Sequence, residues 1–182
     1  MFNPILKITA QKIALLASVV LLASTLPALA VEEDAESNNL IMPHVTIKQG
    51  SDLTVDAKEA RENKVPVLIL FAMEHCPFCM VVEEEFLKPM LRNAEYGKKV
   101  IIRKIKIDST TGLRDFSGKQ RDAGEFSEDY NVSLVPTVVL LDADGKKLAP
   151  SIVGLANRYY YGGDLDNAID ASLLRLRAIA KR

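Results

Sequence analysis

The feature that most constrains the fold is a continuous apolar run that leads into a pair of cysteines. Residues 65–71 read VPVLILF, and the absence of alternation predicts a β-strand buried on both faces of a sheet. Cys76 and Cys79, the only two cysteines of the chain, follow in the sequence CPFC. Pro77 favours the first turn of a helix, because its missing N–H has no helical partner there. We therefore expect two thiols at the carboxyl end of a central strand, with Cys76 at the N-cap of the next helix.

The remaining pattern predicts an α/β fold in the order strand, helix, strand, hairpin, helix. Right-handed crossover makes the two strands around the cysteine helix parallel neighbours. Reactive sites favour the carboxyl edge of such a sheet. The other predicted elements are an edge strand at 44–48, a helix at 51–64, a strand at 100–107, a long loop at 109–124, a short helix at 125–130, hairpin strands at 137–141 and 147–149 around a turn at 142–146, and a helix at 164–180.

The helix that begins at Pro77 has a one-sided apolar pattern. Its spacing predicts a buried stripe, with the acidic residues 83–85 mostly outside. Pro89 is expected to end or kink the helix. The members of the expected stripe are Phe78, Cys79, Val82 and Phe86.

Residues 1–30 have the pattern of a cleaved secretory signal peptide. Lys7 and Lys12 precede a short apolar stretch, and the small-residue sequence ALA ends the segment. The apolar stretch is shorter than the roughly 20 residues that a membrane-spanning helix needs. The polar, acidic residues 31–43 predict a disordered lead-in. We therefore expect one folded domain over residues 44–182.

Export affects how the cysteines are interpreted. Cleavage of the predicted signal peptide removes Lys7 and Lys12, which leaves 21 of the 23 basic residues against 24 acidic ones. The resulting net charge of −3 provides no positive field to attract nucleic acid. The remaining 152 residues can bury a real core without a disulfide. Disulfides persist in oxidising compartments such as the periplasm, but a structural one normally closes a long loop. The short gap between Cys76 and Cys79 therefore indicates a redox role.

The arrangement resembles the thioredoxin superfamily over most of residues 45–180. The resemblance is carried by residues 71–79 (FAMEHCPFC), by Val135-Pro136-Thr137 ahead of the hairpin, and by Val153-Gly154 before the last helix. It implies a thioredoxin-like fold, in which a central mixed β-sheet is flanked by helices. It also implies that Pro136 is a cis-proline facing the dithiol, and that Val135 and Pro136 contribute to substrate binding.

The chain departs from ordinary thioredoxins near the dithiol. The family's buried acid, six residues before the first cysteine, is Leu70 here, so the usual proton relay is absent or replaced. Lys104 matches the family's lysine on the next strand, and without the acid we expect it to be solvated. The usual tryptophan is His75, which could lower the pKa of Cys76 when protonated. Glu74 could oppose that effect or accept protons, and simple exposure to solvent is the alternative for both.

The expected chemistry of the pair follows from its position. At a helix N-terminus, Cys76 meets unpaired N–H groups and the positive end of the helix dipole, which stabilise a thiolate and make it the attacking sulfur. Cys79, one turn further on, would stay protonated until it resolves the mixed disulfide. Pro77 and Phe78 tune this balance, and neither donates a hydrogen bond to sulfur, which argues against a very powerful oxidant. The exchange needs no metal or organic cofactor.

We therefore predict a periplasmic thiol-disulfide oxidoreductase that acts on disulfides of other exported proteins. The resemblance is closest to periplasmic thioredoxin-like proteins associated with sulfur oxidation or cytochrome maturation. Those proteins mostly work as reductases fed by a membrane thiol electron donor, so the resemblance implies reduction. A disulfide-forming oxidase is the alternative, which Val135 before Pro136 and the compartment both permit. The sequence carries no signal for an oligomeric state.

Other uses of the dithiol have fewer supporting residues. Haem attachment needs His directly after the second cysteine, where Met80 stands. A zinc site would require both His44 and His75 to join the two sulfurs, so we predict no metal site. Copper transfer through the cysteines with Met73 or Met80 is a further alternative. An adaptor domain whose cysteines are incidental is the last.

Overall fold

Residues 44–179 are described by a computed structural model of the chain. The predicted signal peptide (1–30), the predicted lead-in (31–43) and the last residue of the predicted final helix, Ala180, lie outside the described residues. The helices and strands are, in chain order, α2 (Leu53–Asn63), β1 (Val67–Ala72), α3 (Pro77–Val82), η2 (Glu83–Leu87), α4 (Lys88–Arg92), α5 (Ala94–Gly97), β2 (Ile101–Lys106), β3 (Leu113–Arg114), β4 (Gln120–Arg121), α6 (Ala123–Glu128), β5 (Thr137–Leu141), β6 (Ile152–Val153) and α7 (Arg158–Ile179).

The main sheet has the strand order β2-β1-β5-β6 and mixes parallel and antiparallel pairs. β1 is parallel to β2, with Val67 beside Ile101, as the sequence predicted. β1 is antiparallel to β5, which brings Thr137 beside Phe71 at the end of β1. Every residue of β1 is buried, in agreement with the unbroken apolar run. The predicted mixed sheet flanked by helices is confirmed.

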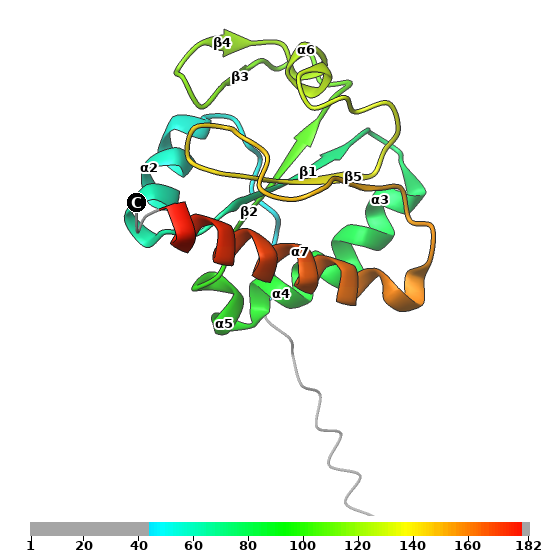
Figure 1. Cartoon of the computed structure of the whole chain (residues 1–182). Helices are drawn as coiled ribbons and strands as arrows, with labels where there is room; N and C mark the ends of the chain where they lie inside the picture. The colour runs from blue at the N-terminus through cyan, green and yellow to red at the C-terminus, as the bar shows by residue number, and fades with distance from the viewer. Residues whose placement is uncertain (1–43, 180–182) are drawn as a thin grey trace, which may run out of the picture. The chain divides into compact units, whose positions relative to one another are not determined.

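Helices cover both faces of this sheet (Figure 1). α7 crosses it on the side of α3 and α4, whereas α6 and the β3–β4 hairpin lie on the other side. On the α6 side, the ring of Phe71 lies 6.1 Å from that of Phe126 and 5.9 Å from that of Tyr130. On β2, Arg103 pairs with the buried Asp56 of α2 at 2.6 Å. None of the helices in residues 44–179 is long and apolar enough to cross a membrane.

The cysteine helix continues through Pro89 to Arg92, so proline does not end it. A turn of π-helix over Glu83–Leu87 ends two residues before the proline, and the Lys88 N–H donates to the carbonyl of Glu83. Proline cannot donate the next helical hydrogen bond, and a wider turn is one way to accommodate it.

The apolar stripe of this helix is confirmed for three of its four members. Cys79 and Val82 are buried, and Phe86 packs against the core and lies 5.0 Å from the ring of Tyr161. Phe78 is 61% exposed, so its predicted burial is wrong. Successive helical residues are about 100° apart around the axis, because 3.6 of them make a turn. Phe78 lies at one edge of the stripe in the first turn of α3, about 100° around the axis from Cys79.

One of the two expectations on the hairpin after β5 needs correction. The turn at 142–146 forms as predicted, with the Asp142 carboxylate accepting from the N–H groups of Asp144 and Lys146. The second arm at 147–149 is only an isolated bridge at Lys147, and β6 supplies the paired strand instead. Pro150 interrupts the arm because it has no N–H to donate to the ladder.

The segment predicted as a loop at 109–124 contains the β3–β4 hairpin. Asp115 makes its turn, because one carboxylate oxygen accepts from the N–H groups of Ser117 and Lys119. Gly118 provides the positive φ of 88° that the turn requires. The short helix expected over 125–130 is α6, which begins slightly earlier after Asp122 as N-cap.

The two ends of the described chain also differ from expectation. Residues 44–48 form no strand, although Gln49 makes an isolated parallel bridge to Lys104 of β2. The last helix begins at Arg158 rather than at Asp164. Asn157 caps it, because its side chain accepts from the Tyr159 N–H at 3.0 Å. The helix that starts at this cap continues through the glycine pair at 162–163.

Candidate active site

Cys76 and Cys79 form a disulfide at the carboxyl end of β1. Their sulfurs are 2.10 Å apart and their Cα atoms 5.2 Å apart. β1 ends at Ala72, a turn over residues 73–75 follows, and α3 begins at Pro77. The strand, turn and helix therefore place the pair where the sequence predicted it.

The two sulfurs have different surroundings. Cys76 is the N-cap of α3, and its sulfur accepts a hydrogen bond from the Cys79 N–H at 3.2 Å. Cys76 is half-buried, whereas Cys79 is 1% exposed within the core. An N–H group at a helix start favours negative charge on the sulfur that it faces. In the reduced protein the accessible sulfur is therefore the one suited to attack, and the sheltered one is suited to resolve.

The residues before β5 lie at the same edge of the sheet. The Val135–Pro136 peptide bond is cis, as the resemblance implied. Thr137 pairs with Phe71, so Pro136 comes beside the last residues of β1, from which the chain turns into the dithiol. The Pro136 carbonyl accepts from the Gly154 N–H at 2.7 Å, which ties β6 to this edge.

Exposed apolar side chains come from the elements around the disulfide. Phe78 and Met80 are exposed on the first turn of α3, and Val135 is half-buried on the cis-proline segment. Leu134 and Val153 are also exposed, and the side chain of Leu134 lies next to Gly154. The surroundings of the dithiol are therefore apolar on the side of β5 and β6.

Charged groups lie on the β2 side of the dithiol, in the turn over residues 73–75. Glu74 forms an ion pair with Lys106 at the end of β2. Its N–H also donates to both carboxylate oxygens of Asp108, at 2.9 and 3.2 Å. The hydrogen bond from Lys106 lowers the pKa of Glu74, and the positive charges of Lys106 and His75 add to this effect. His75 is exposed and has a positive φ of 54°.

Lys104 is not solvated, so that expectation is wrong. Its ammonium lies 2.7 Å from a carboxylate oxygen of Glu83, and each of the two side chains is 15% exposed. Glu83 is one helical turn after Cys79, and it reaches the sheet from α3. Lys104 lies beside the buried Leu70 in the β1–β2 register. A carboxylate from the helix therefore pairs with this lysine, although the strand carries none.

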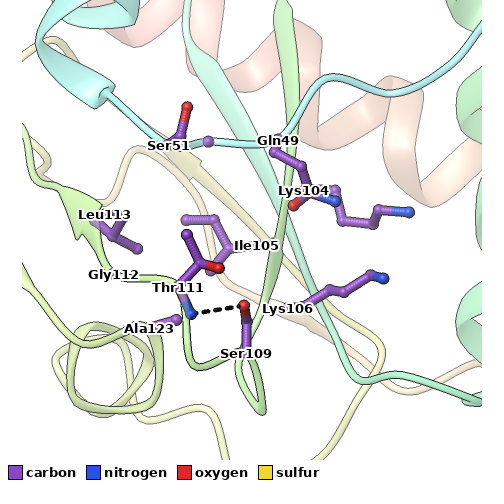
Figure 2. Close-up of a pocket in the computed structure, with 11 residues that line it drawn as sticks. Gln49, Ser51, Lys104, Ile105, Lys106, Ser109, Thr111, Gly112, Leu113 and Ala123 are labelled. Carbon is purple, nitrogen blue, oxygen red and sulfur yellow. Dashed lines mark hydrogen bonds between the residues drawn. The ribbon is translucent and has the colours of Figure 1, made fainter.

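A pocket near this edge does not contain the dithiol. Its volume is about 230 Å³, and it lies between residues 49–51, β2 and the segment after β2 (Figure 2). Ile105 forms part of its wall, and Ser109 and Thr111 line it from the loop. The ammonium groups of Lys104 and Lys106 are engaged by Glu83 and Glu74. In residues 44–179, no three His, Cys, Asp or Glu side chains gather to hold a metal ion.

The sequence singled out the cysteines, Pro136, His75 and Glu74, but it missed Asp108 and Glu83. Asp108 follows β2 directly, and the carboxyl ends of parallel strands meet at one edge of a sheet. That rule could have placed Asp108 next to the dithiol turn. The position of Glu83 depends on the rotation of α3 relative to the sheet, which helical spacing alone does not define.

Comparison with known proteins assigns this architecture to a family. A thioredoxin-like domain is recognised over residues 53–167. No curated protein sequence matches the chain. One similar solved structure is a poplar thioredoxin h, with 20% sequence identity and a TM-score of 0.46, and the match covers 64% of this chain and 86% of that one. A second is a Fasciola hepatica thioredoxin, with 19% identity and a TM-score of 0.47, and the match covers 68% of this chain and 97% of that one. A third is mitochondrial thioredoxin 3 of Saccharomyces cerevisiae, with 22% identity and a TM-score of 0.43, and the match covers 68% of this chain and 93% of that one.

The chain belongs to the thioredoxin-like family. A thioredoxin-like fold with a Cys-x-x-Cys disulfide at the start of a helix defines a thiol-disulfide oxidoreductase. The sequence-based predictions of the fold and of this class of enzyme are confirmed.

Proposed function

We propose that the protein is an exported thiol-disulfide oxidoreductase of the periplasm that reduces disulfides in other exported proteins. The observation that carries the proposal is the difference between the two sulfurs, with Cys76 accessible at the helix start and Cys79 buried one turn later. Export is supported by the signal-peptide pattern of residues 1–30.

The reaction transfers two electrons through a mixed disulfide. The Cys76 thiolate attacks one sulfur of the client disulfide, and the client's other sulfur leaves as a thiolate. Cys79 then loses its proton and attacks the Cys76 sulfur. The second client sulfur leaves, and the Cys76–Cys79 disulfide closes. The client is reduced and the protein oxidised, so a thiol donor, which we place in the membrane, must restore the dithiol.

The surroundings of Cys76 favour reduction over strong oxidation. A strong oxidant has a reduced form that is unusually stable, which requires strong stabilisation of the thiolate. Only the Cys79 N–H is observed to donate to this sulfur within the described residues, and neither Pro77 nor Phe78 has a side-chain donor. The apolar surroundings formed by Phe78, Leu134 and Val153 would suit apolar client segments next to the target disulfide.

The direction is tested by the reduction potential of the Cys76–Cys79 couple in glutathione or dithiothreitol buffers. We expect a value near about −270 mV, where thioredoxins lie. A value well above about −200 mV would contradict reduction and support the oxidase.

Activity is tested by reduction of insulin disulfides with the wild type and with Cys76→Ser and Cys79→Ser. An oxidoreductase loses this activity in the Cys76 variant. Unchanged activity there would contradict the proposed chemistry, and a wild type without activity would favour an adaptor or copper carrier. Location is tested by fractionation of cells that express the full chain, with the shortened form expected in the periplasmic fraction.

A further inference from the structure

The turn that carries Cys76 depends on contacts from outside itself. Residues 73–75 lie between β1 and α3, and all three are exposed. His75 adopts the left-handed backbone region, which costs a non-glycine residue roughly 1 kcal/mol or more. A turn of this kind keeps one conformation only where other groups hold it.

Three consecutive residues at the end of β2 supply these contacts. The Ile107 N–H donates to the Ala72 carbonyl at 2.9 Å, which extends the β1–β2 ladder. Lys106 forms an ion pair with the Glu74 carboxylate. Asp108 accepts the Glu74 N–H at 2.9 Å, two residues before Cys76.

The bond to Asp108 differs from the other observed bonds in residues 44–179 in which an aspartate accepts a backbone N–H. Asp115, Asp122 and Asp142 accept backbone N–H groups only two to four residues away, and so stabilise their own turns. The Asp108–Glu74 bond spans 34 residues and joins the end of one strand to the turn after its neighbour. Its effect therefore falls on the dithiol turn.

We propose that Asp108 is a positioning residue for Cys76, whose carboxylate holds the turn so that the sulfur stays at the start of α3. The proposal rests on the thiol exchange proposed above. The Asp108 carboxylate has two opposing effects on the stability of the Cys76 thiolate. Holding the sulfur close to the Cys79 N–H stabilises the thiolate, whereas the negative charge of Asp108 near the same turn disfavours it. Glu74 adds a second negative charge there, and Lys106 provides an opposing positive one.

Two substitutions separate these effects. Asp108→Asn keeps an oxygen that can accept the Glu74 N–H but removes the charge. Asp108→Ala removes both the acceptor and the charge. Asp144→Asn is the matched control, because Asp144 is also an exposed turn residue and follows β5, whose last residue pairs with Val67 at the opposite end of β1.

The test is the rate of alkylation of Cys76 by iodoacetamide in the reduced full chain, measured across pH. We expect Asp108→Asn to lower the pKa of the Cys76 thiol, since only the charge is lost. At neutral pH Asp108→Ala should react about three- to tenfold more slowly than Asp108→Asn, which is the effect of one lost hydrogen bond. Asp144→Asn should match the wild type. Equal rates for the Asn and Ala variants would overturn the proposal.

A second measurement does not depend on reactivity. Amide hydrogen exchange at Glu74 should be faster in Asp108→Ala than in Asp108→Asn, with the rest of β1 and α3 unchanged. Equal exchange in the two variants, or general loss of protection in both, would overturn a role confined to the turn. Alkylation also needs no disulfide partner. A wild type that fails to reduce oxidised glutathione would therefore contradict the proposed function, while the rates of these two variants would still decide the role of Asp108.

Discussion

Two lysine–glutamate pairs join β2 to residues before and after the dithiol in the chain. Lys104 pairs with Glu83 of the cysteine helix, and both side chains are 15% exposed. Lys106 pairs with Glu74 of the preceding turn, and these side chains are 31% and 55% exposed. Lys104–Glu83, the inner pair, involves the helix that contains the buried Cys79. Lys106–Glu74, the outer pair, involves the turn that precedes the accessible Cys76. The Lys104–Glu83 pair is therefore expected to contribute mainly to the stability of the fold, and the Lys106–Glu74 pair mainly to the reactivity of Cys76.

The largest expected effect comes from replacing one cysteine or the other, because the two sulfurs have different roles. Cys76→Ser should lower insulin reduction to the uncatalysed background, because no accessible thiolate remains to attack. Cys79→Ala should still attack but should accumulate mixed disulfides, because nothing resolves them. Non-reducing electrophoresis and mass spectrometry of periplasmic extracts measure the trapped complexes. Complexes trapped by Cys76→Ala instead would reverse the assignment of the two cysteines.

The next effect distinguishes the two ion pairs through stability. Glu83→Gln or Lys104→Met leaves a largely buried charge without its partner, and each should lower the free energy of unfolding by about 1–3 kcal/mol. Glu74→Gln should change it much less, because exposed pairs contribute little. Urea unfolding of the oxidised proteins measures both.

Unfolding at high salt and a double variant test the same difference in stability between the two ion pairs. The loss caused by Glu83→Gln should persist at high ionic strength, because buried pairs are screened much less than exposed ones. The combined Glu83→Gln and Lys104→Met variant should recover part of the stability lost in the single ones, since no unpaired charge remains. A Glu83→Gln protein as stable as Glu74→Gln would contradict the difference between the pairs.

The smallest effect is the pH dependence that the outer pair contributes. Lys106 lowers the pKa of Glu74 below its ordinary value of 4.5, so the folded state binds this proton less readily than the unfolded one. The resulting stabilisation is present above pH 4.5 and is lost as the pH falls through the folded-state pKa. The melting temperature of Glu74→Gln should therefore fall slightly less than that of the wild type on acidification. A steeper fall in the variant would contradict the sign.

The sequence predicted the centre of the fold better than its periphery. The run at 65–71 and the following CPFC determine a buried strand, a turn and a capped helix, and each depends on residues close together in the chain. The predictions for the arm at 147–149 and the segment at 109–124 are wrong, because Pro150 ends the pairing of the first and the Asp115 turn folds the second into a hairpin. The predicted start of the last helix is wrong because Asn157 caps it at an earlier position.

The site was predicted where local rules apply and missed where packing decides. Cys76 as N-cap follows from Pro77, and the register of β1 and β5 brings Pro136 to the same edge. The Lys104–Glu83 pair requires the angle at which α3 lies on the sheet. The Asp108 contact spans 34 residues and depends on the exact end of β2. Charged side chains of this kind have no periodic pattern that reveals their partners.

The most direct test of the central claim is the relative reactivity of the two thiols in the reduced chain. Limited iodoacetamide at neutral pH, followed by peptide mass spectrometry, gives the fraction of label on each cysteine. The account predicts that Cys76 carries nearly all of the label, with an alkylation pKa below the ordinary cysteine value of about 8.5. Equal labelling of Cys76 and Cys79, each with an ordinary pKa, would contradict it.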